Sequence, residues 1–187
     1  LAQPNVHVVS GIEEIQGNRL MAADGSDCEV DVIIYATGFE VANPPVAEII
    51  TDASGRSLSA QWQGSPEAFL GTTANDCPNL FLTFGPNLYT FSSAFVIIEA
   101  QIQYIMSALK KARTQKLATL TIKPNIARVY NDELQHALQS SVWNSGGCTS
   151  YFMDKNGRNS TNWPWTTFHM RRRMRRFKVS DYQVTSL

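Results

Sequence analysis

The run at residues 30–39, Val-Asp-Val-Ile-Ile-Tyr-Ala-Thr-Gly-Phe, constrains the fold more than any other stretch of this sequence. Five of its first six residues are β-branched or aromatic, and no charge follows Asp31. A short apolar run of this kind predicts a strand buried on both faces of a parallel sheet. The small residues Ala36, Thr37 and Gly38 come at the strand end where open α/β sheets bind ligands. On residue types alone, a core strand followed by a tight turn explains the run equally well.

Composition and charge narrow the class of protein. The 187 residues are 43% hydrophobic and 17% charged, which is enough for one globular domain with a proper core. The zero net charge argues against a general nucleic-acid binder, and no apolar run approaches the ~20 residues of a membrane span. The distant cysteines Cys28, Cys77 and Cys148 indicate neither a disulfide framework nor a zinc site. We therefore expect a cytoplasmic protein.

The first 38 residues predict a small β-meander. We expect a strand at Val6–Val9, and the turn pairs Gly17-Asn18 and Asp24-Gly25 separate further short strands that lead into the buried run. The chain begins at Leu1 without a Met, and it contains no Gly-x-Gly-x-x-Gly turn. We therefore expect the carboxyl-terminal piece of a longer protein.

A strand, a turn and a helix are predicted in the middle of the chain. Residues 80–84 form a second buried-strand run, which Gly85-Pro86-Asn87 ends. A glycine turn beside a helix amino terminus offers free N–H groups, which can stabilise electron-rich atoms such as the pyrimidine edge of a reduced flavin. Most units of this kind bind nothing, so the residues alone favour a structural role.

The helix that follows should begin after an N-cap at Ser92 or Ser93 and end near Arg113. Apolar residues at spacings of three and four predict its buried face: Phe95, Ile98, Ile102, Ile105, Met106 and Leu109. A strand at residues 119–123 and a helix from Asn125 to about Gln139 come next, with His136 in a surface or packing role.

The final third holds a hairpin turn at residues 154–158 and six residues, 171–176, of which five are arginine. A run of arginines can bind phosphate or nucleic acid. A solvated helix face explains it better here, because the chain as a whole has no net charge.

Three stretches resemble one family. Asp-x-Ile-Ile-x-Ala-Thr-Gly-Phe at 31–39 is similar to the second "ATG" signature of flavin-containing and Baeyer–Villiger monooxygenases. Pro-Asn-Leu-Phe-x-x-x-Gly-Pro-Asn at 78–87, with Glu-x-Gln-x-x-Tyr-Ile at 99–105, resembles the last FAD-domain strand and helix of Baeyer–Villiger monooxygenases. Gly-Gly-Cys-Thr-Ser-Tyr-Phe at 146–152, followed by Gly-Arg-Asn and Trp-Pro, is similar to the carboxyl terminus of one Baeyer–Villiger subgroup.

The resemblance implies an α/β fold, the carboxyl-terminal portion of a flavoprotein with two dinucleotide-binding domains, one for FAD and one for NADP. It would contain a β-meander, parallel-sheet strands and packing helices. Residues 1–38 would end the NADP-binding domain, and residues 39–142 would form the carboxyl-terminal part of the FAD-binding domain. Residues 143–187 would be an extension that lines the cofactor and substrate cleft.

The resemblance also implies an activity. The complete enzyme would use FAD, NADPH and O2 to convert a ketone into an ester or lactone. The family's peroxide-stabilising arginine lies upstream of the matched region, so no catalytic residue and no metal ligand is assigned. Tyr151 replaces the family's usual Trp and Trp165 stands where Gly is usual, which leaves the substrate open. The cofactor contacts that the resemblance implies are Thr37, Gly38, Gly85, Pro86, Asn87, Ser150 and Tyr151.

The fragment should be inactive without the missing amino-terminal half, its expected partner, because the phosphate-binding turns lie there. Two alternatives remain at this point. One is a fragment of an N- or S-oxidising flavin monooxygenase. The other is a non-catalytic remnant or interaction module that uses the basic terminal helix.

Overall fold

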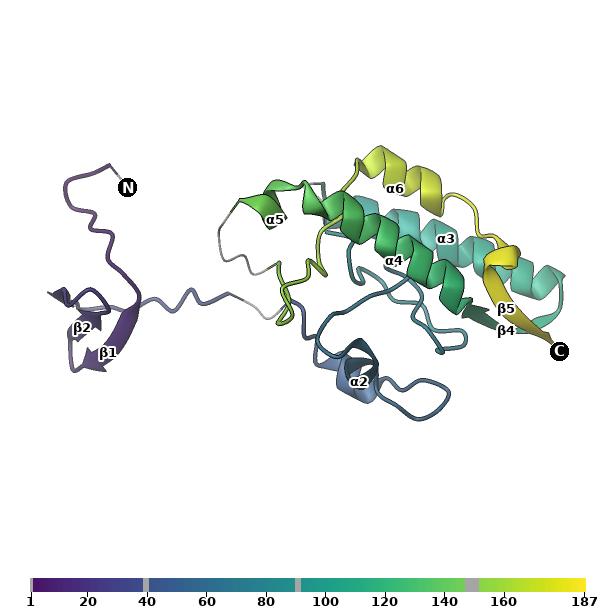
Figure 1. The fold of residues 1–187 in the computed structure, drawn as a ribbon, viewed down its shortest axis with the longest axis horizontal. Helices are drawn as coiled ribbons and strands as arrows, with labels where there is room; N and C mark the ends of the chain where they lie inside the picture. The colour runs from purple at the N-terminus through teal and green to yellow at the C-terminus, as the bar shows by residue number, and fades with distance from the viewer. Residues whose placement is uncertain (1, 39–40, 90–91, 147–151) are drawn as a thin grey trace. The chain divides into compact units, whose positions relative to one another are not determined.

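The computed structural model describes residues 2–38, 41–89, 92–146 and 152–187, and the chain divides into two compact units, residues 1–38 and 39–187 (Figure 1). Within these described ranges, no helix combines the length and the apolar character that crossing a membrane requires. The assignment of the two units to NADP and FAD domains stays a prediction.

The first unit is a three-stranded antiparallel meander in the order β1-β2-β3. Its strands are β1 Ile12–Gln16, β2 Arg19–Ala22 and β3 Asp27–Glu29. The predicted turns are confirmed, since Gly17 and Gly25 adopt φ values of +62° and +80° that favour glycine. The strand expected at residues 6–9 is not formed. Val8 is 77% exposed, and an isolated extended segment has no neighbour to satisfy its backbone groups.

The buried strand predicted at residues 30–35 is also not formed in this chain. β3 ends at Glu29, and Ile34 and Tyr35 are 85% and 74% exposed. A strand inside a parallel sheet needs a hydrogen-bonded neighbour on each side, and no described strand of this chain pairs with residues 31–38. The apolar pattern is real, but its partner strands are not among the described residues.

The described residues of the second unit form helices and a two-stranded sheet. Two short helices come first, α1 Val46–Ile49 and α2 Leu58–Trp62, and share a small core with Ala74 and Cys77. The larger core lies among the elements that follow. These are α3 Ala94–Thr114, β4 Leu117–Ile122, α4 Pro124–Gln139, α5 Val142–Ser145, α6 Thr167–Met174, the 3-10 turn η1 Val179–Asp181 and β5 Tyr182–Ser186.

The strand predicted at residues 80–84 is replaced by an irregular loop. Asn79 and Phe84 adopt φ values of +59° and +52°, which interrupt an extended strand at both ends. Isolated hydrogen bonds to other segments hold the loop in place of the regular hydrogen-bond ladder of a strand. One of them runs from the Leu82 N–H to the Thr72 carbonyl at 2.7 Å. Among the described strands, β4 and β5 pair antiparallel, and the one parallel pairing is an isolated bridge between Tyr89 and Asn162.

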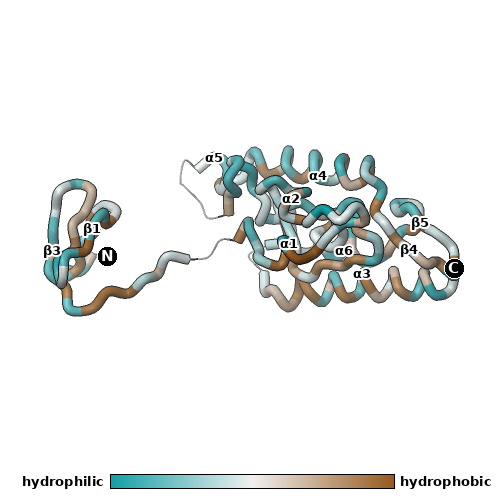
Figure 2. The backbone as a smooth tube through the Cα atoms, turned by 90° about the horizontal axis from the view of Figure 1, so that it is seen from below, coloured by the Kyte–Doolittle hydropathy of each residue, from teal (hydrophilic) through white to brown (hydrophobic). Residues whose placement is uncertain are grey.

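Helix α3 begins and ends as predicted but buries a different face. Ser93 is its N-cap, with the hydroxyl accepting from the Phe95 N–H at 3.3 Å, and Lys111 and Arg113 lie in the last turn. Hydrophobic residues recur along the helix (Figure 2), and the face that enters the core consists of Ile97, Ala100, Gln101, Tyr104 and Ala108. The predicted stripe is mostly exposed: Phe95 is 83%, Met106 59%, Ile102 49% and Leu109 49% exposed.

The strand and helix predicted after α3 are confirmed as β4 and α4. The N-cap position of α4 is Lys123 and not Asn125, because Pro124 occupies the first turn, where its missing N–H costs nothing. His136 is exposed, as predicted. The turn at residues 154–158 is confirmed, with an isolated antiparallel bridge between Met153 and Asn159 in place of two strands.

Candidate functional site

The loop at residues 84–89 is the best-defined part of the implied cofactor site. Gln101 of α3 is fully buried and holds the start of this loop. Its Oε1 accepts from the Phe84 N–H at 2.7 Å, and its Nε2 donates to the carbonyls of Gly71 at 3.0 Å and Leu82 at 3.1 Å. One amide thus joins a helix to two loops.

Gly85 is required by the close approach of two backbones. A Cβ added to Gly85 would lie 2.3 Å from the carbonyl oxygen of Gly71, far inside van der Waals contact. The same crowding affects Gly71, whose added Cβ would meet the Leu88 side chain. The need for glycine at position 85 therefore has a packing cause within the chain itself.

Asn87 ties this loop to the last third of the chain. Its side chain is 1% exposed, and its Nδ2 donates to the carbonyls of Asn159 at 2.8 Å and Asn162 at 3.1 Å. Its backbone N–H donates to the Ser160 carbonyl at 3.0 Å, and its φ of +57° suits an asparagine. The Gly-Pro-Asn loop and the Gly-Arg-Asn segment, two of the three resembling stretches, are therefore in direct contact.

The segment that receives Asn87 is itself held on several sides. Asn159 is fully buried, and its carbonyl also accepts from Gln135 of α4 at 2.9 Å. Asp154 organises the preceding turn by accepting from the N–H groups of Asn156 at 2.9 Å and Arg158 at 3.0 Å. Sequence reasoning missed this buried asparagine cluster, although the repeated asparagines in the quoted motifs were a visible signal.

A chain of buried hydroxyl groups lies on the same face of α3, one turn after Gln101. The Tyr104 and Tyr182 hydroxyls are 2.8 Å apart, and Tyr182 also meets the Thr73 hydroxyl at 3.2 Å. Burial raises the pKa of Tyr182 to about 12 and raises the pKa of Tyr104 further still. Both tyrosines therefore stay neutral and serve as structural hydrogen-bonding groups between α3 and β5.

The structure brings together only part of the predicted cofactor contacts. Gly85, Pro86 and Asn87 share one loop, where the first two are half-buried. Thr37 and Gly38 are exposed at the end of the first unit, with open space around Gly38 and a φ of +80°. Ser150 and Tyr151 lie outside the described residues.

Most of the polar groups of Asn87 are already hydrogen-bonded within the protein. The Asn87 Nδ2 donates to two protein carbonyls, and its Oδ1 is buried and has no hydrogen-bond partner among the described residues. Within the described ranges, no three His, Cys, Asp or Glu side chains gather as metal ligands would.

Comparison with known proteins gives a consistent picture. No protein-family profile matches the chain. The chain is 42% identical over 187 residues to a Baeyer–Villiger monooxygenase of Streptomyces coelicolor and 38% identical over 189 residues to one of Pseudomonas aeruginosa. The matches cover 98% and 100% of this chain but 36% of each relative. The chain therefore spans about a third of the length of these relatives, and the resemblance found from the three motifs is confirmed.

Solved structures show the same fold. Cyclohexanone monooxygenase from Rhodococcus sp. Phi1 bound to NADP+ matches 100% of this chain with a TM-score of 0.78 and 21% identity, over 37% of its own length. OTEMO in complex with FAD and NADP matches 98% of this chain with a TM-score of 0.81 and 21% identity, over 35% of its length. At this identity the likeness establishes the fold alone.

Proposed function

We propose, on the premise that this chain is the carboxyl-terminal part of a Baeyer–Villiger monooxygenase, that the complete enzyme inserts one oxygen atom of O2 into a ketone to give an ester or lactone. The observation that carries the proposal is the 42% and 38% identity to two Baeyer–Villiger monooxygenases over the whole chain. NADPH would supply the two electrons that reduce the second oxygen atom to water.

The proposed cofactors are FAD and NADPH. When bound, the flavin supplies the redox chemistry with O2, and the protein supplies binding, orientation and exclusion of water. This chain lacks a Gly-x-Gly-x-x-Gly turn, so the phosphates of both cofactors would be held by the remaining two thirds of the enzyme.

Within this chain, we assign the loop at residues 85–87 to one edge of the flavin site. Gln101 and the buried asparagine cluster hold the loop in place before any ligand arrives, which reduces the entropy lost on binding. Thr37 and Gly38 are proposed as backbone contacts from the first unit, and Ser150 and Tyr151 as contacts near the nicotinamide and the substrate.

The deciding experiment is to express this chain within its complete coding frame and to assay the product. We expect ketones to yield esters or lactones with consumption of one NADPH for each product, and the 187-residue chain alone to show no turnover. Amines and sulfides are assayed beside the ketones, because an N- or S-oxidising enzyme would prefer them. Preferential turnover of these would replace the ketone proposal, and flavin binding without turnover of any class would indicate a non-catalytic remnant.

A further inference from the structure

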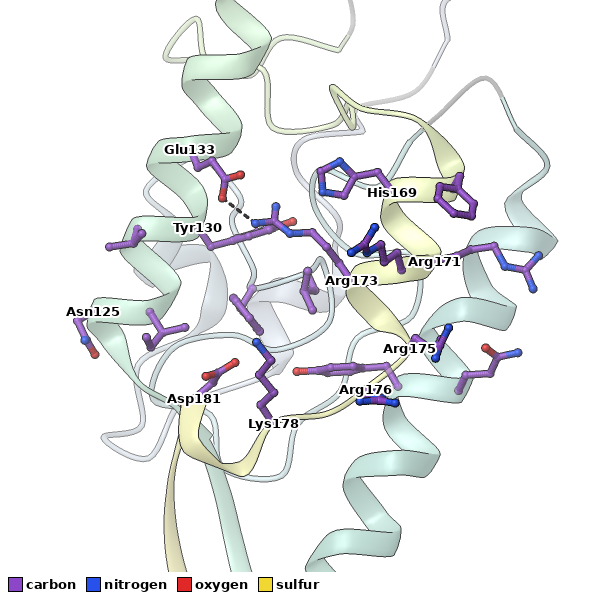
Figure 3. A pocket seen from close by; sticks show the side chains of 18 residues that line it. Asn125, Tyr130, Glu133, His169, Arg171, Arg173, Arg175, Arg176, Lys178 and Asp181 are labelled. Atoms are coloured by element: carbon purple, nitrogen blue, oxygen red, sulfur yellow. Dashed lines mark hydrogen bonds and ion pairs between the residues drawn. The ribbon is translucent and has the colours of Figure 1, made fainter.

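A wide basic groove lies in the second unit, and its lining does not include the loop at residues 84–89. It has a volume of about 1340 Å³ and is bounded by α3, α4, α6 and the segment that leads to η1 (Figure 3). Two acidic side chains line it, Glu133 and Asp181. Six cationic side chains line it as well, which leaves a net charge of +4: Arg171, Arg172, Arg173, Arg175, Arg176 and Lys178.

Most of this positive charge is not neutralised within the chain. Arg173 pairs with Glu133 at 2.7 Å, and Arg171 approaches Glu99 at a long 3.9 Å. Among the described residues, no carboxylate lies within 4.0 Å of the other four cations. Clustered cations raise each other's free energy, and a bound anion relieves this repulsion.

The floor of the groove holds two hydrogen-bond donors that have no acceptor among the described residues. Tyr130 is 4% exposed, and its hydroxyl has no partner among the described residues. The Nη1 of Arg173 is also buried without a partner there. The Arg173 guanidinium lies over the Tyr130 ring at 5.5 Å and over the Trp165 ring at 5.3 Å. Figure 3 shows it reaching from α6 towards Tyr130 and Glu133 of α4.

A buried donor without an acceptor lowers the stability of the fold, because it has lost its hydrogen bonds to water and gained none in return. Buried polar groups are therefore almost always hydrogen-bonded, and two exceptions in one groove indicate a ligand. Both donors belong to side chains that line the groove, and its lining includes six cationic side chains. An oxyanion that displaces Glu133 from Arg173 would meet the guanidinium in the planar geometry that arginine offers to phosphate.

We propose that this groove binds a small phosphate-bearing molecule. Arg173 and Tyr130 form the floor of the site, and Arg172, Arg175 and Arg176 supply charge at its rim. A phosphate monoester suits the groove better than a carboxylate, because a dianion compensates more of the +4 charge. This inference is independent of the proposed oxygenase chemistry, since the groove does not include the residues assigned to the flavin.

The test is calorimetric titration of the 187-residue chain with inorganic phosphate and with pyrophosphate in a phosphate-free buffer. We expect saturable binding at one site. Arg173→Gln should weaken it by about tenfold or more, as loss of a charge-assisted hydrogen bond predicts, and Tyr130→Phe should weaken it several-fold. Arg113→Gln, which removes an exposed charge outside the groove, is the matched control and should leave the affinity within about twofold.

Equal weakening by Arg113→Gln would overturn the proposal, because it would show binding to the overall charge. The absence of saturation would do the same. A single-stranded oligonucleotide that binds more tightly than pyrophosphate would assign the groove to nucleic acid instead. If Arg173→Gln does not fold, the exposed Arg176→Gln replaces it, and unchanged affinity in that variant would count against the site.

Discussion

Gln101 shows how one buried polar residue can define a loop. Its amide group satisfies the N–H of Phe84 and the carbonyls of Gly71 and Leu82, which belong to loops without a ladder of their own. A buried amide without partners is expensive, whereas a fully bonded one selects a single loop conformation. The loop that carries Gly85 is therefore specified from α3.

Replacing Gln101 by Met keeps its volume and removes these bonds. We expect the free energy of unfolding to fall by about 2 to 4 kcal/mol. The Phe84 N–H loses its acceptor, and the carbonyls of Gly71 and Leu82 lose their donor. Denaturant unfolding of the chain measures this. Gln103→Met, at an exposed position of the same helix, is the control. Equal effects of the two changes would show that Gln101 is not the loop's anchor.

Asp52 should make the stability of the second unit depend on pH. Its side chain is 1% exposed and accepts hydrogen bonds from the Ser54 hydroxyl and from the Arg56 backbone N–H. The bond from Ser54 is the main reason that the pKa of Asp52 lies well below the ordinary 3.8. Because the pKa of Asp52 is lower in the folded state than in the unfolded state, the ionised side chain stabilises the fold at pH values above the unfolded-state pKa. This stabilisation is lost progressively as the pH falls below that pKa towards the folded-state value.

We therefore expect Asp52→Asn to lower the melting temperature near neutral pH. We also expect the melting temperature of this variant to fall less than that of the unaltered chain when the pH is lowered to about 3. Thermal melting at the two pH values measures both effects. Asp132→Asn, at an exposed position on α4, should change neither. An unchanged acid response in Asp52→Asn would place the pH sensitivity at other carboxylates.

At the scale of elements, helix bounds could be predicted from the sequence better than helix faces. The N-cap, predicted at Ser92 or Ser93, and the cations near Arg113 are local signals, and the structure confirms both, with Ser93 as the cap. The buried face depends on what packs against the helix. Two stripes of α3 have helical spacing, and α6 and β4 contact the one that contains the small residues Ala100 and Ala108, which allow close approach.

The exposed stripe of α3 should favour self-association without stabilising the fold. We expect Ile102→Gln with Met106→Gln to change the free energy of unfolding by less than about 0.5 kcal/mol and to reduce aggregation. Light scattering and denaturant unfolding measure the two properties. Ile97→Gln is the control, because Ile97 is fully buried and its replacement should unfold much of the protein. Strong destabilisation by the double variant would contradict the prediction, because it would show that this stripe packs in the core.

At the scale of the whole molecule, strands were harder to predict than helices. Residues 30–35 have the pattern of a buried strand, yet a strand forms only where a neighbour accepts its hydrogen bonds. The sequence selects Gly85, Pro86 and Asn87 as proposed flavin contacts, and they stay a prediction, whereas the support of their loop by Gln101 and Asn159 could not be predicted from the sequence. Those contacts join positions far apart in the chain, and spacing rules describe only neighbours.

The first unit should be the least protected part of this chain. Among its described residues only Ala22 is buried, so its sheet has almost no core. We expect backbone amides of β1 to β3 to exchange hydrogen much faster than those of α3 and α4. Mass-spectrometric hydrogen exchange measures this, first on the 187-residue chain and then on the complete enzyme, where residues 30–35 should gain protection. Slow exchange of β1 to β3 in the chain alone would contradict the prediction.

The bonds from Asn87 to the carbonyls of Asn159 and Asn162 bear on how this protein can be recombined with its relatives. A chimaera with a crossover between residues 92 and 146 inherits the loop from one parent and its receiving segment from the other. The stability of such shuffled proteins would then follow the match between the two parental segments. Libraries that exchange residues 85–89 and 154–163 as one block keep that match intact.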